Sequence, residues 1–256
     1  MKSIARATAA LLFLATAVFA RYHELVWDHE KICSTLLERA KAGEVSPKRI
    51  NYEALRLNCA RTSWYLDRDE TKINELSSEM WKAAMKVEPE RVQRAAEAIL
   101  ELNYLDMQAH KFLSEALSGM KKDTAEARRH REFELGLLRA LARSGSGKSC
   151  EEGQVVLDVE EEYFVFRVMG WTPAGQTLVE EEGHRCDRMK YRDGKGETRT
   201  IYFDVDIPFE NYARGAKPMP EGMLRLMQFP STLNPEYYRH FAPMADGEIA
   251  SMKIFD

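Results

Sequence analysis

Two different spacings of apolar residues divide the chain near residue 143. Before that point, apolar side chains recur every three or four residues among charged ones, which is the period of a helix with one buried face. After it, Val, Tyr, Phe and Thr alternate with polar residues in short segments separated by glycine, which is typical of strands. The pattern predicts an α+β fold, in which antiparallel helical hairpins precede a small antiparallel β-sheet or half-barrel.

The apolar stripes in the first part predict helices joined by short turns. The stripes run over Leu25–Ala40, Tyr52–Cys59, Ile73–Val87, Val92–Leu102, Leu113–Met120 and His130–Leu141. Pro89 favours the first turn of the fourth helix, because proline lacks the N–H that this position leaves unpaired. Helix starts near Pro89 and Asp123 lie about 34 residues apart, a spacing that resembles a degenerate tetratricopeptide repeat. A plain helical bundle is the alternative.

The alternating segments in the second part predict strands. They are Gln154–Val159, Tyr163–Met169, Gln176–Glu181, Arg185–Tyr191 and Thr198–Asp206. The acidic run Glu160–Glu162 is interpreted as an exposed turn between the first two. Asp193-Gly194 predicts a hairpin between the last two, because this dipeptide accepts the positive φ that such turns require. Pro208 ends the last strand, and Phe209–Arg214 predicts one helical turn.

The glycine-rich segment Arg143–Cys150, RSGSGKSC, joins the two parts and resembles a phosphate-binding loop at its end. A phosphate loop also requires a glycine five residues before Gly147, where this chain has Ala142. The order of elements is reversed as well, because a helix precedes the segment and a strand follows it. We therefore interpret residues 144–149 as a helix cap and hinge, with glycine free to adopt positive φ.

Residues 1–20 have the features of a secretory signal peptide. Lys2 and Arg6 precede an apolar run, Ala9–Phe19, that is too short for a membrane span, and Ala20 offers a cleavage site. A buried N-terminal helix is the alternative. Cleavage removes two of the 37 basic residues and none of the 41 acidic ones, which leaves a net charge of −6. This acidity argues against nucleic-acid binding, and no later apolar run is long enough to span a membrane.

The expected organisation follows from these boundaries. A signal peptide at 1–20 precedes a helical part at 21–143, the hinge at 144–149, a β part at 150–214 and a tail rich in Pro, Met and aromatic residues at 215–256. Export to the periplasm or the cell exterior would allow the four cysteines to form disulfides in one of three connectivities. Pairing within each part, Cys33 with Cys59 and Cys150 with Cys186, is the simplest. Buried free thiols are the alternative.

Several short motifs together resemble one family. They are the run Ser144–Ser149, Glu162-Tyr163, Gly170, Gln176 with Leu178-Val179, Gly183-His184 with Asp187, and Tyr202-Phe203 with Pro208-Phe209. In order and spacing they are similar to the bacterial domain-of-unknown-function 4919 family over about residues 50–215. The resemblance implies a secreted or envelope protein with a tetratricopeptide-like helical front and a compact β end. It implies no activity, and Ser146, Cys150 and Cys186 depart from its pattern.

Few residues suggest catalysis. His184 follows Gly183 at a strand start and has Asp187 nearby, and a histidine oriented by a carboxylate could act as a base. No G-x-S-x-G, H-E-x-x-H or C-x-x-C motif accompanies it, so a hydrogen bond that stabilises a turn is the alternative. Asp204 and Asp206 share a strand face and could hold a cation, but no recognisable loop supplies further ligands. We predict no metal and no cofactor.

A binding surface is the other interpretation. Trp171 follows Gly170 outside any apolar stripe, as expected for an exposed aromatic anchor, and His184 and Tyr202 could border the same surface. A core position for Trp171 is the alternative. We therefore predict a non-enzymatic binding or scaffold module of the cell envelope whose partner is another envelope or secreted protein. An envelope hydrolase, or another enzyme with a site around His184 and Asp187, is the alternative, and the oligomeric state is not predicted.

Overall fold

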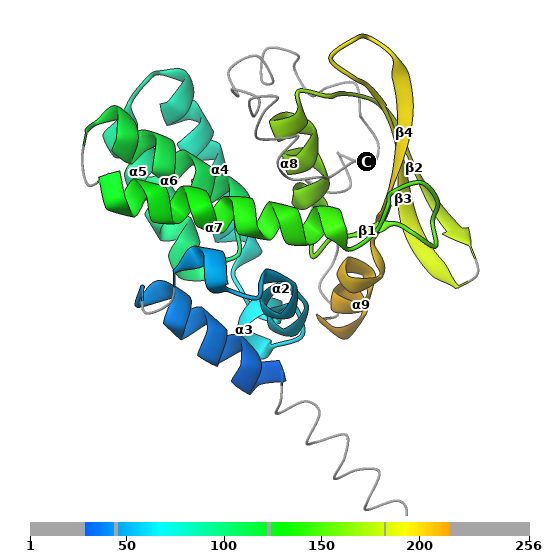
Figure 1. The fold of residues 1–256 in the computed structure, drawn as a ribbon, viewed down its shortest axis with the longest axis horizontal. Coiled ribbons are helices and arrows are strands. Elements are labelled where there is room, and N and C mark those ends of the chain that lie inside the picture. Colours follow the sequence, from blue (N-terminus) through cyan, green and yellow to red (C-terminus); the bar gives the residue numbers. More distant parts are fainter. Residues whose placement is uncertain (1–28, 44–45, 122–123, 182, 216–256) are drawn as a thin grey trace, which may run out of the picture.

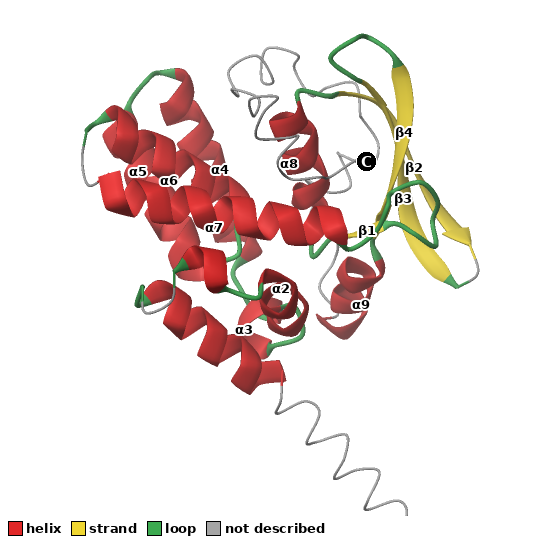
Figure 2. Ribbon diagram, viewed as in Figure 1, coloured by secondary structure: helices red, strands yellow, loops and turns green. Residues whose placement is uncertain are grey.

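The computed structural model describes residues 29–43, 46–121, 124–181 and 183–215 of the 256. Most of its helices precede a four-stranded sheet, so the predicted α+β class is confirmed (Figures 1 and 2). The helices are residues 29–41, α2 (Tyr52–Cys59), α3 (Ser63–Leu66), α4 (Glu70–Met85), α5 (Pro89–Leu102), α6 (Met107–Gly119), α7 (Thr124–Arg143), α8 (Val159–Met169) and α9 (Asp206–Gly215), with a 3-10 turn η1 (Pro47–Arg49). The strands are β1 (Gln154–Val155), β2 (Thr172–Glu181), β3 (His184–Arg192) and β4 (Thr198–Asp204).

The helical part matches the predicted helices closely. Asn51, Asp69 and Asp106 cap α2, α4 and α6, each by accepting a hydrogen bond from a backbone N–H three residues later. α5 begins at Pro89, as expected. Short connections fold each of the helices α5 to α7 back onto the one before it. α3 was not predicted, and the residues before 29, which include the expected start of the first helix, lie outside the described ranges. No helix within those ranges has the length and apolar character that a membrane span requires.

The sheet has the order β1-β4-β3-β2. β2–β3 and β3–β4 are antiparallel hairpins, and the Asp193-Gly194 turn lies between β3 and β4 as predicted. β1 instead pairs in parallel with β4, so that Gln154 lies beside Phe203. The antiparallel prediction is therefore correct for the hairpins and wrong for β1, which also ends four residues earlier than the expected strand.

The segment expected to be the strand Tyr163–Met169 is instead helix α8, and the acidic run before it is not a turn. Asp158 caps α8 by accepting a hydrogen bond from the Glu161 N–H, and Gly170 ends the helix with a φ of 65°. Glutamates in the first turn of a helix are favoured by its dipole. α8 lies between the helical part and the sheet, and Glu161–Val168 are all buried. A helix buried on every side has no polar stripe, and for that reason its sequence resembles a buried strand.

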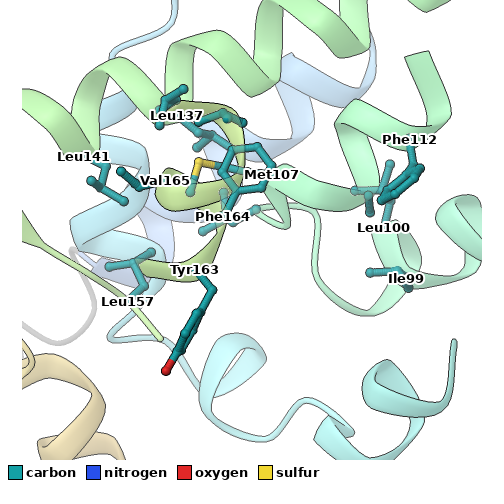
Figure 3. Packing of buried hydrophobic residues seen from close by; sticks show 14 of the residues in the cluster. Ile99, Leu100, Met107, Phe112, Leu137, Leu141, Leu157, Tyr163, Phe164 and Val165 are labelled. Atoms are coloured by element: carbon teal, nitrogen blue, oxygen red, sulfur yellow. The ribbon is translucent and has the colours of Figure 1, made fainter. Parts of the chain in front are cut away.

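One hydrophobic core runs through both parts of the chain. Figure 3 shows Phe164 and Val165 of α8 among Met107 of α6 and Leu137 and Leu141 of α7. The opposite side of α8 packs on the sheet, where Phe203, Ile201, Met189 and Tyr191 define what we call the inner sheet face. Packing on both sides makes α8 the element that joins the helices to the sheet.

The predicted hinge at 144–149 is attached to the sheet by hydrogen bonds. Gly147 has a φ of 68°, its N–H donates to the Glu152 carbonyl, and its own carbonyl accepts from the Tyr202 N–H at 2.9 Å. A Cβ on Gly147 would lie 2.9 Å from Cγ1 of Ile201, so glycine is required there for space as well as for conformation. Because the Gly147 N–H already has a partner, it is not available to a phosphate group.

All four cysteines form disulfides, and the pairing is the one expected within each part. Cys33 of the first helix is bonded to Cys59 of α2, and Cys150 is bonded to Cys186 of β3. The second bond joins the connection that follows α7 to β3, one of the two middle strands of the sheet.

Replacing Val87 by glycine is expected to raise the free energy of unfolding by about 1 kcal/mol. Val87 follows the end of α4 and has a φ of 58°, a region that β-branched residues rarely occupy. The residue is 84% exposed, so little packing would be lost. Urea denaturation measures the change. Val87→Ala keeps a Cβ and should gain less than Val87→Gly; an equal gain would mean that backbone strain is not the cause.

Candidate functional site

A polar cluster lies where β3 begins and β4 ends. Because these strands are antiparallel, His184 at the start of β3 lies near Asp204 at the end of β4 and Asp206 at the start of α9. His184 Nδ1 is 3.2 Å from Asp206 Oδ2, and Asp206 Oδ1 accepts the Arg185 N–H at 3.0 Å. The Asp206 N–H in turn donates to Asp204 Oδ1 at 2.9 Å. We call His184, Asp204 and Asp206 the rim cluster.

The rim cluster is polar and partly open to solvent. The His184 side chain is 52% exposed, whereas that of Asp206 is 26% exposed. Burial raises the pKa of Asp204, the hydrogen bond from the Asp206 N–H opposes this, and the negative charge of Asp206 raises the pKa again. One ligand atom from each residue lies within 4.8 Å of the others, so the three could hold a cation. The Arg185 guanidinium is 3.8 Å from Asp206, so it would compete with a bound cation for the negative charge of the Asp206 carboxylate.

The structure separates two residues that the sequence placed in one candidate site. Asp187 is three positions from His184, and residues an odd number apart in a strand point to opposite faces. Asp187 is only 2% exposed and accepts a hydrogen bond from Gln176 Nε2 at 2.6 Å, beneath α8. His184 is oriented by Asp206 instead. The structure therefore does not bring His184 and Asp187 together, which the strand spacing alone could have indicated.

The expected binding residues also divide between the two faces of the sheet. Trp171 is 8% exposed and stacks on Tyr191, with ring centroids 4.1 Å apart, so it occupies the core position that was the alternative. Tyr202 is half-buried and lies opposite Arg188 on the other face. That face, which points away from α8, we call the outer sheet face. Its members on β3 and β4 are His184, Cys186, Arg188, Lys190, Arg192, Thr198, Thr200, Tyr202 and Asp204.

Buried charges on α8 were missed by the sequence analysis. Glu161 Oε2 accepts hydrogen bonds from Arg56 Nη2 at 2.6 Å and from the Leu157 N–H at 2.8 Å. Arg56 is 1% exposed and also donates to the Val155 carbonyl. Asp158 followed three residues later by Glu161 is the spacing of a helix start, and it is the signal that could have revealed α8.

A protein-family model matches most of the chain. The model of a family described as a domain of unknown function, DUF4919, matches residues 34–214, which include the rim cluster, α8 and the Cys150–Cys186 disulfide. Comparisons with curated proteins and with solved structures give no match.

Proposed function

The chain belongs to the domain-of-unknown-function 4919 family, and we propose that it is an exported protein that works by binding another envelope or secreted protein. The family description names no activity, so the proposal depends on the residues of this chain. The observation that carries it is the outer sheet face. This face has an exposed histidine, basic side chains and a tyrosine, while the inner face is filled by α8.

The two disulfides support export. Disulfides persist in oxidising compartments and are rare in reducing ones, so two of them in a chain without free cysteines favour the periplasm or the cell exterior. The sequence features of residues 1–20 favour the same location, although these residues lie outside the described ranges. We propose cleavage before Arg21.

The residue composition of the outer sheet face suits a protein contact. His184 and Lys190 are exposed, and Arg188 and Tyr202 are half-buried. Tyrosine and arginine are enriched at interfaces because they combine apolar area with hydrogen-bonding groups. The helical part, which we propose to be tetratricopeptide-like, would act as the scaffold that presents this face. Trp171 has no part in the contact, because it is buried against Tyr191.

The rim cluster favours an enzyme as the second candidate. Asp206 is placed to hold Nδ1 of His184, which leaves the other ring nitrogen of a half-exposed imidazole able to accept a proton. All four cysteines are paired, so none of them is free to act as a nucleophile. In a hydrolase of this kind His184 would activate water as the base, with Asp206 in the role first given to Asp187.

Affinity capture from envelope extract tests the proposal. The native protein should be recovered from the envelope or the medium, and its intact mass should equal that of a chain that begins at Arg21. With this mature chain as bait, His184→Ala and Tyr202→Ala should each weaken capture of a specific partner by about tenfold or more, equivalent to ~1.4 kcal/mol. Arg94→Ala, on the exposed side of α5, is the matched control and should bind as wild type does.

Two outcomes would contradict the binding proposal. If both variants are folded and keep every wild-type partner, the outer sheet face is not the contact surface. If the purified protein turns over an envelope substrate, and His184→Ala and Asp206→Asn lose this turnover while Tyr202→Ala keeps it, the enzyme replaces the binding protein.

A further inference from the structure

A polar network is buried between α8 and the inner sheet face. Glu162 of α8 is 0% exposed and Asp187 of β3 is 2% exposed. The Tyr163 hydroxyl donates to Gln176 Oε1 at 2.7 Å, and Gln176 Nε2 donates to Asp187 Oδ2 at 2.6 Å. The hydrogen bonds therefore run from α8 through β2 to one oxygen of Asp187.

With both carboxyl groups ionised, three carboxyl oxygens in this network have no hydrogen-bond donor among the described residues. They are both oxygens of Glu162 and Oδ1 of Asp187. Two ionised carboxylates can only accept hydrogen bonds, so neither can satisfy the other. Buried unpaired charges of like sign are strongly unfavourable. A single proton on Glu162 would supply the missing donor and remove one of the two charges.

The surrounding charges all favour that proton. Burial has the largest effect and raises the pKa of Glu162 well above its usual range, and the charge and hydrogen-bond acceptance of Asp187 raise it further. Asp158 and Glu160, at the start of α8, act in the same direction. Among the described residues, the groups with the largest effects on the pKa of Glu162 and of Asp187 are acidic or uncharged. Burial also raises the pKa of Asp187, but hydrogen bonds from Gln176 and from Glu162 lower it, so Glu162 is the group that holds the proton.

We propose that Glu162 and Asp187 share one proton in the folded protein and that its loss at alkaline pH releases α8 from the sheet. The apolar contacts of Phe166 with Tyr191 and Phe203 lie in the same interface, so two adjacent negative charges there would oppose a well-packed core. Separation would expose the inner sheet face. The carboxyl pair is thus a pH-sensitive connection between the helical part and the sheet.

The sign of the pH dependence follows from proton linkage. The native pair binds one proton more than the unfolded chain at any pH between the ordinary carboxyl pKa and the raised native pKa. The stabilisation by this proton is complete below the ordinary value and is lost as the pH rises through that interval. One extra bound proton corresponds to a tenfold change in the unfolding constant for each pH unit.

Urea denaturation of the mature chain from pH 5 to pH 9 tests the proposal. The unfolding constant of the wild type, relative to that of Glu162→Gln, should rise about tenfold per pH unit over the interval in which the proton is lost. Glutamine keeps an N–H donor for Asp187 and cannot ionise, so this variant should fold. Glu97→Gln, an exposed residue on α5, is the matched control and should follow the wild type.

Hydrogen exchange provides the local measurement. After correction for the intrinsic pH dependence of exchange, amides of residues 159–169 should open more often at pH 9 than at pH 6 in the wild type, while those of residues 89–102 should not. Parallel pH profiles for the wild type and Glu162→Gln would overturn the proposal. A second result would also overturn the proposal: a chelator or added Ca²⁺ shifts the pH profile of the wild type but not the profile of Glu162→Gln. A cation would then take the place of the proton. If Glu162→Gln does not fold, a pH-independent wild-type unfolding constant is the overturning result.

Discussion

Replacing Arg56 by methionine is expected to lower the free energy of unfolding by about 3–5 kcal/mol. The guanidinium is buried and donates to Glu161 and to the Val155 carbonyl, so its removal leaves a carboxylate in the core without its cation. Glu161 would keep only its hydrogen bond from the Leu157 N–H. Urea or thermal denaturation measures this loss of stability, which we attribute to weaker attachment of α2 to α8.

Two further variants serve as controls for this prediction. Arg56→Met combined with Glu161→Met replaces both charges by apolar side chains and should recover much of the lost stability, because the unpaired charge is gone. Lys72→Met removes an ion pair with Glu75 that is exposed on both sides and should cost less than about 1 kcal/mol. If Arg56→Met costs no more than Lys72→Met, the buried pair does not attach α2 to α8.

Removing the Cys150–Cys186 disulfide by a double serine substitution is expected to cost roughly 4 kcal/mol. The two cysteines are 36 residues apart, and the bond limits the conformations of the unfolded chain over that length. The loss should also loosen the rim cluster, since Cys150 Sγ lies 3.8 Å from the His184 carbonyl and Cys186 is paired with Asp204. Denaturation and the binding assay measure the two effects.

The Cys33–Cys59 bond offers the matched comparison. It spans 26 residues, so its removal should cost nearly as much, roughly 3.5 kcal/mol, but it lies in the helical part and should leave partner binding unchanged. A Cys150→Ser/Cys186→Ser variant as stable as the wild type would contradict the prediction. So would free thiols at these positions in the native protein.

The sequence predicted those elements whose signal is local. α5 has an apolar stripe and a proline at its start, and the β3–β4 hairpin has an Asp-Gly turn, so both were placed almost to the residue. The helix α8 was not predicted, because both of its sides are buried and its sequence therefore lacks the helical alternation between apolar and polar positions. Its partners, Arg56 and Asp187, come from distant parts of the chain and give no local signal.

In the candidate site, too, local features could be predicted and contacts between distant segments could not. His184 and Asp206 were both identified from the sequence, but their pairing depends on two antiparallel strands and the start of a helix, which a local pattern does not encode. Trp171 was ambiguous because it lies outside any stripe, and its stacking on Tyr191 requires the folded sheet. Residue types were therefore predictable, whereas their partners were not.

The central position of α8 also bears on how the chain folds. The packing of α4 to α7 and the pairing of β2 to β4 both join segments that are adjacent in sequence, and such contacts form quickly. Long loops must close where α2 packs against α7 and where α8 and β1 meet the rest, as in the Arg56–Glu161 pair and the pairing of β1 with β4. We expect the helices and the hairpins to form early and independently, and the docking of α8 between them to limit the folding rate.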